Sequence, residues 1–420
     1  MILKARLPNG VRVLSEPIPG AISVSLGIWV ENGSRYEEPR HNGVSHFIEH
    51  LLFKGTRRRN ATQIAEEIDA VGGILNAFTG KEYTCYYAKV LGEHLGLATD
   101  LLADIFLESI FDPGEIERER QVVIQEISQA EDTPDDFIHD LFNLNFWQGH
   151  PLALPVFGSA QTVGSFDRTL VTSFMAERYR AERVFIAAAG AVDHDRLLAD
   201  CTKLFAGIPS NCATPALHPP SERHVVLTCE KPLEQAHLCI GGPNLSQAHE
   251  LRYASYVLNT ALGGGMSSRL FQEVRERRGR VYSIFSSIAA FLDCGYLVVY
   301  AGTNPDWVAE VIEVTLGELK KMAHDGLARD ELDRAKSQLK GNMLLGMEST
   351  EARMNRLARN EIYFGRDIPL DEVARGLESV SNDQIVELAS SCFHPDRMTM
   401  VILGDLKGKR PGQDAFSVLV

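Results

Sequence analysis

Apolar side chains return every three or four positions in "SHFIEHLLFKGT", residues 45–56. This spacing is typical of one buried helix face, and it predicts a helix over residues 43–55. The same pattern predicts a second helix over residues 61–71. Three polar residues interrupt the apolar ones in the first helix: His46, Glu49 and His50. A helix that is otherwise buried therefore has a polar face that needs an explanation.

Runs of β-branched and aromatic residues predict strands at matching places in the two halves of the chain. The first half opens with "VRVLSEP" and "AISVSLGIWV", and the second opens with "HVVLTCE" and "AHLCIGG". Further along, "ILNAFTGKEYTCYYAKV" corresponds to "VYSIFSSIAAFLDCGYLVVYAGT". Each half closes on a strand that begins at an arginine, Arg183 in the first half and Arg397 in the second.

The predicted helices also recur in the same order. Helices at 43–55, 61–71, 93–109 and 115–131 correspond to helices at 249–262, 267–277, 304–324 and 328–347. The order predicts a duplicated α+β unit of about 200 residues, with a mixed sheet and helices in each copy. Two unrelated α+β domains are the alternative, because the two halves share little sequence identity.

A chain of 420 residues is longer than one hydrophobic core usually supports. The Pro-rich stretch "GIPSNCATPALHPPSER" near the middle is typical of an inter-domain linker. We therefore expect an N-terminal domain at residues 1–210, a linker at 211–222 and a homologous C-terminal domain at 223–420.

Composition narrows the class of protein. The formal charge of −14 disfavours binding to nucleic acid and favours cationic ligands. The seven cysteines form no C-x-x-C pair, which argues against a disulfide framework and a thiolate zinc site. No apolar run is long enough for a membrane span, and the N-terminus lacks the apolar core of a secretory signal. We expect a cytoplasmic protein, unless a leader has been removed.

The helix predicted over residues 43–55 places His46 and His50 on one face, with Cβ atoms about 5–6 Å apart. One metal ion with bonds of about 2.0–2.1 Å can bridge two imidazoles held at this separation. Glu49 is then beside the ion, where its carboxylate can act on a water. The alternatives are a chance H-x-x-E-H in a chain with 13 histidines, or histidines satisfied within the core. A third ligand would decide between these interpretations.

The stretch "IERERQVVIQEISQAEDTPDD", residues 116–136, offers that third ligand. Its apolar residues form a helical stripe, and Glu126 stands between Ile124 and Ile127. Carboxylates are seldom buried without a cation or a hydrogen-bond partner, which points to Glu126 as the ligand. Glu119, two turns earlier, suits contact with a histidine ring nitrogen. The alternative for Glu119 is the solvated face that its neighbouring glutamates form.

Two histidines and one carboxylate leave a fourth position on zinc for water, which is the pattern of a catalytic site. Zinc lowers the pKa of such a water to about 7. Glu49 is placed to accept its proton and to deliver it to a departing amine. These residues indicate peptide hydrolysis with one zinc ion per chain.

Four motifs carry a resemblance to a known family: "GVSHFIEHLLFKGT", "GGILNAFTGKEYTCYYA", "ERERQVVIQEI" and "LGGGMSSRLFQEVRERRGRVYSI". The chain resembles the pitrilysin, or insulinase-like, metallopeptidases with the inverted H-x-x-E-H motif. It is most similar to bacterial processing-peptidase-like proteins and to the mitochondrial processing peptidase β subunit. The resemblance runs essentially from end to end.

The resemblance implies a clam-like protein of two homologous α+β halves, with zinc held by the N-terminal half. It assigns His46, His50 and Glu126 as the zinc ligands, Glu49 as the base and Glu119 as the supporting acid. It also places Asn76 and Ala77 on the edge strand that binds the substrate. Addition of a substrate strand to a sheet edge uses main-chain hydrogen bonds and tolerates many sequences.

From the metal-free C-terminal half, Arg275 and Tyr282 match residues that reach the scissile carbonyl. A guanidinium and a phenol can both donate to an oxyanion as it forms. The alternative is that Arg275 is one more charge in "RERRGR" and Tyr282 a packed strand residue. The glycines at 263–265 lack the context of a phosphate-binding loop, and we interpret them as a flexible loop.

The second half has "YVLNTALGGG" where the first has H-x-x-E-H, so one chain carries one metal site. Relatives of this length form homodimers that enclose a chamber, and the resemblance implies the same here. We expect unfolded peptides, including basic ones, as substrates. The alternative function is a catalytic or non-catalytic subunit of a hetero-oligomeric processing-peptidase-like complex that acts mainly by binding a partner.

Overall fold

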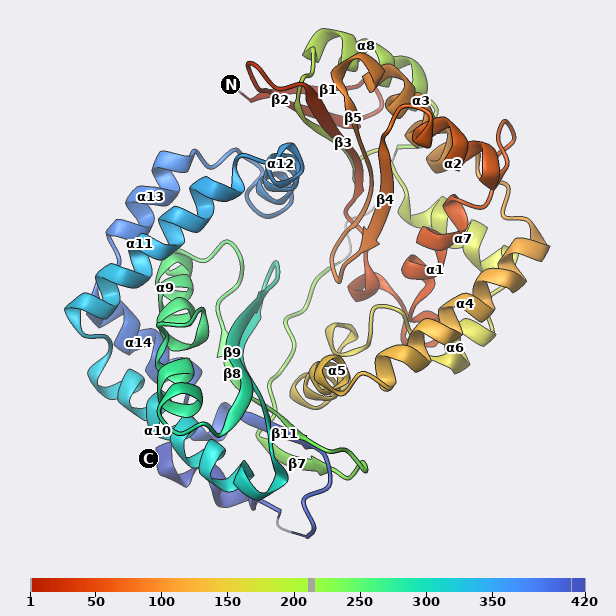
Figure 1. Ribbon diagram of the computed structural model, residues 1–420. Helices are drawn as coiled ribbons and strands as arrows, with labels where there is room; N and C mark the ends of the chain where they lie inside the picture. The colour runs from red at the N-terminus through yellow and green to blue at the C-terminus, as the bar shows by residue number, and fades with distance from the viewer. Residues whose placement is uncertain (1, 211–215, 409, 420) are drawn as a thin grey trace. The chain divides into compact units, whose positions relative to one another are not determined.

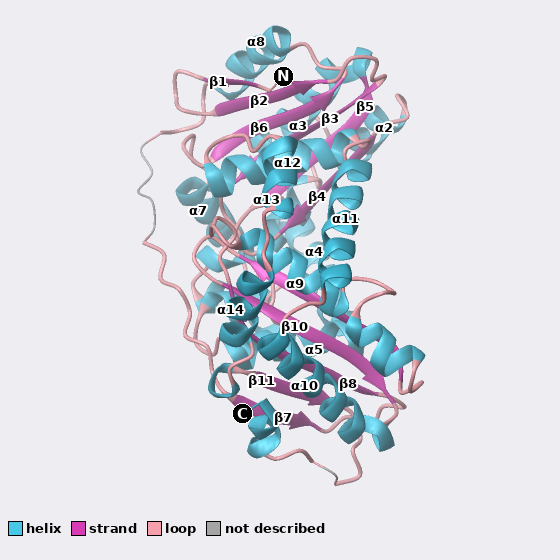
Figure 2. Cartoon of the chain, turned by 90° about the vertical axis from the view of Figure 1, so that its left-hand side faces the viewer, coloured by secondary structure: helices cyan, strands magenta, loops and turns pink. Residues whose placement is uncertain are grey.

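The computed structural model describes residues 2–210, 216–408 and 410–419, and the chain in it forms two compact units (Figure 1). Residues 211–215 of the expected linker lie outside the described residues. Each unit contains one mixed sheet and a set of helices (Figure 2). The α+β class expected from the sequence is therefore confirmed, whereas the clam-like arrangement of the halves stays a prediction.

The first unit is built on a six-stranded sheet with the order β1-β2-β6-β3-β5-β4. Its strands are β1 (Leu3–Arg6), β2 (Arg12–Pro17), β3 (Ser23–Val30), β4 (Ile74–Thr79), β5 (Thr84–Leu91) and β6 (Val184–Gly190). Only β2 and β6 pair in parallel, and all other neighbours are antiparallel. The sheet ends on β4, which has a strand partner on one side only.

The second unit repeats this design in a five-stranded sheet with the order β7-β11-β8-β10-β9. Its strands are β7 (Val225–Cys229), β8 (Ala236–Asn244), β9 (Val281–Ala290), β10 (Gly295–Thr303) and β11 (Thr399–Leu403). The single parallel pair, β7 with β11, occupies the place of β2 with β6. This match in order and direction supports duplication over two unrelated domains.

Most predicted helices occur within a few residues of the expected ranges. The helices of the first unit are α1 (Val44–Leu52), α2 (Ala61–Asp69), α3 (Leu95–Glu108), α4 (Pro113–Glu131), α6 (Ala160–Gly164), α7 (Arg168–Arg178), α8 (His194–Phe205) and α12 (Thr350–Phe364). Those of the second are α5 (Pro134–Phe146), α9 (Arg252–Gly263), α10 (Val308–Asp325), α11 (Arg329–Gly346), α13 (Leu370–Glu378) and α14 (Asn382–Cys392). The helix expected at 267–277 contains a π-helical turn, η5 (Phe271–Glu276). Short 3-10 turns η1–η4 and η6–η8 connect the other elements.

Helices cover both faces of the first sheet, because its central strands are buried on both sides. On β3, Leu26 and Ile28 face the main core with α1 and α3, while Trp29 faces the opposite way. On that opposite side, Trp29 and Phe185 pack against Met354 and other buried residues of α12. A strand alternates its side chains between two faces, so near-continuous apolar strands require a layer on each side.

The second sheet has the same three layers. Leu297 and Val299 of β10 face a core formed with α9, α10 and α14. Val298 and Tyr300, which alternate with them, face α5 through Ile138 and other apolar residues. Each sheet is thus closed on one face by a single helix that comes from the other half of the sequence.

Because each half of the sequence gives one helix to the sheet of the other half, the two compact units do not coincide with the two halves of the sequence. We call this the exchange of α5 and α12. The first unit includes Leu345–Asp367, and the second includes Ala130–Ala153. The expected boundaries at residues 210 and 223 stay a prediction about where the homologous halves end. The compact units have other boundaries because α12 packs its apolar face on the first sheet and α5 packs its apolar face on the second.

The sequence predicts neither a membrane span nor a disulfide framework. Within the described residues, no helix combines the length and apolar character that crossing a membrane requires. The six cysteines in the described part of the chain are free thiols, and four of them are buried.

Candidate metal centre

Helix α1 buries one face and leaves the other to the polar residues of the H-x-x-E-H motif. Its buried residues are Val44, Ser45, Phe47, Ile48, Leu51 and Leu52. His46, Glu49 and His50 are only partly buried and lie on the remaining face. The apolar spacing that predicts the helix therefore also aims these three side chains at one place.

A buried carboxylate from the preceding loop fixes the N-terminus of α1. The helix starts after Gly43, whose φ of 98° is in the left-handed region, and it has no capping side chain of its own. Instead, Glu37 accepts hydrogen bonds from the backbone amides of Gly43 at 2.7 Å and Ser45 at 2.8 Å. Burial raises the pKa of Glu37, and these hydrogen bonds oppose that rise. An acceptor at this end of a helix satisfies amides that have no partner within the helix.

The side chains of His46, His50 and Glu126 converge into one group of metal-ligand composition. The Oε2 atom of Glu126 lies 3.4 Å from His50 Nε2 and 3.9 Å from His46 Nε2. One ligand atom from each residue lies within 4.8 Å of the others. Ligands bonded to a tetrahedral ion such as zinc stand roughly 3.4 Å apart, so this donor set fits such an ion. Among the described residues it is the only group of this kind.

Glu119 supports His50 from the side opposite the shared ligand position. Its Oε2 atom lies 3.1 Å from His50 Nδ1, and its Oε1 atom lies 2.8 Å from the ammonium of Lys54. The Glu119 side chain is only 7% exposed, whereas that of Glu126 is 42% exposed. The burial expected from the sequence for Glu126 thus belongs to Glu119, which lies a further two turns back on α4.

The pKa values of the two histidines diverge because their surroundings differ. Burial, together with the nearby charge of His50, lowers the pKa of His46 to about 4. Burial also lowers the pKa of His50, but the hydrogen bond with Glu119 and the charges of nearby carboxylates outweigh it and raise the pKa. The pKa of Glu119 is lowered, since its bonds with His50 and Lys54 outweigh burial. Two imidazoles that share one place with a carboxylate form a donor set that a divalent cation can bind in competition with protons.

Glu49 stands next to this group with one carboxylate oxygen engaged. Its Oε2 atom accepts a hydrogen bond of 2.5 Å from the hydroxyl of Thr79, the last residue of β4. Its Oε1 atom has no hydrogen-bond partner in the described part of the chain. Burial raises the pKa of Glu49, and the bond with Thr79 and the charge of His50 oppose this rise. A carboxylate with one free oxygen and a raised pKa is suited to proton transfer.

The edge strand β4 runs along this site and carries Asn76 and Ala77. It pairs with β5 through Asn76 and Tyr87, and through Ala77 and Tyr86, so its other side is open to a further strand. The amide of Ala77 donates to the side-chain oxygen of Asn76 at 2.8 Å. The exposed Asn76 side chain therefore occupies a main-chain donor that an added strand would use.

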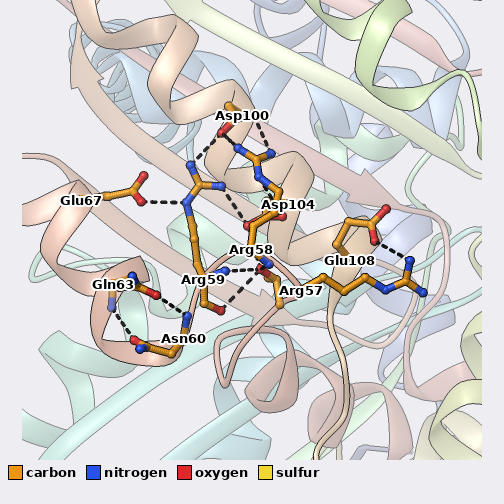
Figure 3. A network of polar contacts seen from close by, with 10 residues as sticks. Arg57, Arg58, Arg59, Asn60, Gln63, Glu67, Asp100, Asp104 and Glu108 are labelled. Atoms are coloured by element: carbon orange, nitrogen blue, oxygen red, sulfur yellow. Dashed lines mark hydrogen bonds and ion pairs between the residues drawn. The ribbon is translucent and has the colours of Figure 1, made fainter.

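The segment after α1 is tied to α3 by a network of ion pairs (Figure 3). Both terminal nitrogens of Arg58 donate hydrogen bonds to Asp100. Arg59 donates hydrogen bonds to Asp100 and to the buried Asp104. Asp104 also accepts a hydrogen bond of 2.9 Å from Thr56. These contacts fix the segment that follows α1 on α3.

In the second unit, Arg275 and Tyr282 lie against each other. The guanidinium of Arg275 is 5.9 Å from the ring centre of Tyr282 and 4.7 Å from that of Phe271. Tyr282 is 78% exposed, which does not fit the packed strand residue considered as an alternative. The position of Arg275 in a π-helical turn is typical of functional segments.

The neighbouring arginines of this run differ from Arg275. Arg277 and Arg278 both pair with Glu273, and Arg280 pairs with Glu310. Arg275 has no ion pair in the described part of the chain. Its charge is held on aromatic rings and is open to an added anion.

Three residues of the site were not found from the sequence: Glu37, Lys54 and Thr79. Glu37 acts on a helix start six residues away, and an acidic pair before a proline is common in loops. Lys54 resembles any lysine that ends a helix. Thr79 is an ordinary strand residue, so only the fold shows that its hydroxyl meets Glu49.

Two family models match consecutive parts of the chain. Residues 12–160 match "Insulinase (Peptidase family M16)", and residues 165–339 match "Peptidase M16 inactive domain". The first match covers α1 and α4, which carry His46, His50 and Glu126, and it also covers the edge strand β4. The chain belongs to peptidase family M16.

Relatives named zinc proteases match nearly the whole chain. The uncharacterized zinc protease YmxG of Bacillus subtilis is 41% identical over 94% of this chain and 97% of its own length. An uncharacterized zinc protease of Streptomyces coelicolor is 40% identical over 97% of this chain and 91% of its own length. One of Mycobacterium tuberculosis is 42% identical over 97% and 94% of the two chains.

Solved structures share the fold at low sequence identity. A peptidase M16 inactive domain from Pseudomonas fluorescens is 19% identical, with a TM-score of 0.91 over 98% of this chain and all of its own. A protease from Helicobacter pylori is 22% identical, with a TM-score of 0.89 over 96% and 99% of the two chains. At these identities, the likeness supports the fold alone.

Proposed function

We propose that this protein is a zinc-dependent endopeptidase that hydrolyses unfolded peptides. The observation that carries the proposal is the convergence of His46, His50 and Glu126 next to Glu49, which has one carboxylate oxygen bonded by Thr79. The zinc protease names of relatives about 40% identical over most of the chain point to the same ion. Bound zinc supplies a Lewis acid that polarises the scissile carbonyl and lowers the pKa of a water.

The residues of this chain then move the proton and hold the substrate. Glu49 accepts the proton of the attacking water on its free oxygen and delivers it to the departing amine. Glu119 keeps the ring of His50 in the orientation that points Nε2 at the ligand position. Both roles follow from contacts of partly or fully buried carboxylates on rigid helices.

The substrate-binding roles rest on the open edge of β4 and on the second unit. A peptide in extended form adds to β4 at Asn76 and Ala77, and the Asn76 side chain gives way to it. Arg275 and Tyr282 donate hydrogen bonds to the oxyanion that develops on the scissile carbonyl. The exposure of Tyr282, and the lack of a carboxylate partner for the half-buried Arg275 among the described residues, support this role over a structural one.

We further propose a cytoplasmic homodimer that encloses a chamber and admits unfolded chains. The charge of −14 favours peptides of opposite charge. The presence of the full donor set, Glu49 and Arg275 argues against a subunit that acts only by binding a partner.

Metal analysis and peptidase assays on the same preparation test the proposal. The purified protein should hold about one zinc per chain and cleave members of a quenched-fluorescent peptide library. Chelation should abolish cleavage, and added zinc should restore it. Glu49→Gln should keep the zinc while turnover falls by about 10²–10⁴-fold.

Variants of the proposed ligands, together with a control at another histidine, test the ligand assignment itself. His46→Ala and Glu126→Ala should lose the zinc, and His94→Ala, at a half-buried histidine outside the site, should keep both zinc and activity. Full zinc occupancy in the first two variants would disprove the ligand assignment. Near-native turnover in Glu49→Gln would show that another group activates the water.

A further inference from the structure

We propose that Thr79 is the positioning residue for Glu49: its hydroxyl holds one carboxylate oxygen so that the other faces the reacting water. This inference rests on the proposed function, in which Glu49 is the base. It assigns a task to a residue of the substrate-binding strand that binds neither the metal nor the peptide.

The fold places the Thr79 hydroxyl toward α1. Side chains of a strand alternate between two faces, so Ala77 and Thr79 of β4 point to the same side. That side packs against α1, which carries Glu49. Thr79 ends the strand, opposite Thr84 of β5, and a backbone bond from Gly80 to Tyr83 closes the turn.

The turn beyond Thr79 is anchored by a buried ion pair. Glu82, in the turn, accepts a hydrogen bond of 2.6 Å from Arg35, and both side chains are at most 2% exposed. The hydroxyl of Tyr363 donates to the other oxygen of Glu82 at 3.1 Å. The amide of Arg35 also donates to the carbonyl of Lys81 at 2.8 Å. Arg35 and Tyr363 therefore hold the turn that follows Thr79.

The two oxygens of Glu49 have different surroundings as a result. The hydrogen bond of 2.5 Å from Thr79 is the only one that Glu49 Oε2 receives from the described residues, and Oε1 receives none. The last torsion of a glutamate side chain is soft, and a single short bond to a fixed donor is enough to select one orientation. Loss of the hydroxyl would let the carboxylate rotate away from the water.

Strand β4 thus has two roles in the proposed site, to bind the peptide and to position Glu49. Its edge, at Asn76 and Ala77, is where the proposed peptide strand adds, and its last residue aims the base. Thr79 differs from those two residues because its effect should appear in turnover and not in substrate binding.

The test compares three variants of the full-length, zinc-loaded protein. Thr79→Val keeps the shape of the side chain and removes the hydroxyl, and Thr79→Ser keeps the hydroxyl. Thr84→Val is the matched control on the paired strand, where the hydroxyl bonds the carbonyl of Asn32 instead. Zinc content, thermal stability, kcat and KM are measured for each with one quenched peptide.

We expect kcat of Thr79→Val to fall about tenfold to a hundredfold, as for loss of one hydrogen bond to a charged group, with KM and zinc content unchanged. Thr79→Ser should recover most of kcat. Thr84→Val should keep kcat even if its stability falls. In a Glu49→Gln background, which binds without turnover, added Thr79→Val should leave the peptide affinity unchanged.

The inference fails if folded, zinc-loaded Thr79→Val has the kcat of the wild type, or if only its KM or peptide affinity changes. Should Thr79→Val not fold, Thr79→Ala takes its place in the same comparison. An inactive wild-type protein with full zinc would instead refute the proposed function itself, so the two failures are distinguishable.

Discussion

The ammonium of Lys54 lies 2.8 Å from Glu119 Oε1, while the other oxygen of the same carboxylate contacts His50. One buried carboxylate thus joins a cation from the end of α1 to a histidine one turn earlier on the same helix. The pair keeps Glu119 ionised, which lets it accept the ring N–H of His50 and present Nε2 to a metal.

This relationship predicts that Lys54 contributes to metal affinity without being a ligand. Glu119→Gln should weaken zinc binding by about 10–100-fold, and Lys54→Met should weaken it by a smaller factor. Competition with a chromophoric chelator measures both. Lys203→Met, on α8, is the control and should bind as the wild type does. Unchanged affinity in both test variants would show that the contacts are incidental.

The ion pairs of Asp100 predict a pH-dependent contribution to stability. Hydrogen bonds from Arg58 and Arg59 lower its pKa below the ordinary 3.8. A carboxylate with a lowered pKa in the folded state stabilises above its unfolded pKa, and the effect is lost as the pH falls through the folded value. Asp100→Asn should therefore cost roughly 0.5–1 kcal/mol at neutral pH, and the difference should shrink below about pH 4.

Urea unfolding of chelator-treated protein across this pH range provides the measurement. Glu66→Gln is the control, because Glu66 is an exposed residue of α2 without an ion pair in the described structure. A loss for Asp100→Asn that is the same at all pH values would point to packing and not to charge.

The contrast between Arg275 and its neighbours predicts unequal effects within one arginine run. Arg275→Ala should lower kcat/KM by about 10²–10³-fold, as for loss of an oxyanion donor, with full zinc content. Arg277→Ala removes the same charge from an exposed residue paired with Glu273, and should stay near wild type. Equal losses in the two variants would mean that net charge, and not position, matters.

The proposed homodimer predicts a concentration-dependent enzyme. Light scattering should give the mass of two chains, and dilution to monomer should reduce activity. A chain with Arg275→Ala and Tyr282→Phe, mixed with a Glu49→Gln chain, should regain activity if each site combines two chains. The mixture should stay inactive if each chain builds its own site. A fully active monomer, or rapid cleavage of a stable folded protein, would contradict the chamber.

Much of the donor group could be predicted because its spacing is local. The positions of His46 and His50 on one helix face follow from helical geometry, and the apolar stripe of α4 orients Glu119 and Glu126. The sequence did not predict which of the two glutamates is buried, because Glu119 and Glu126 lie on the same side of α4. Only the packing of Lys54 and His50 around Glu119 distinguishes them.

The layers of the fold were harder to predict than its elements. Periodicity indicates where a helix such as α3 or α10 lies, and which face it buries. It does not indicate which sheet receives that face when the partner is distant in sequence, as for α5 and α12. The site residues that depend on such contacts, Thr79 above all, cannot be read from local spacing.

The exchange of α5 and α12 has a consequence for the order in which the protein is made. All six strands of the first sheet have been synthesised at Gly190, yet the helix that covers Trp29 and Phe185 ends only at Phe364. During that interval the growing chain carries an apolar sheet face without its cover, which is a surface that invites aggregation or chaperone binding. The first unit is therefore completed only after α12 has been made, late in translation, and a fragment that stops at residue 210 would keep that bare face permanently.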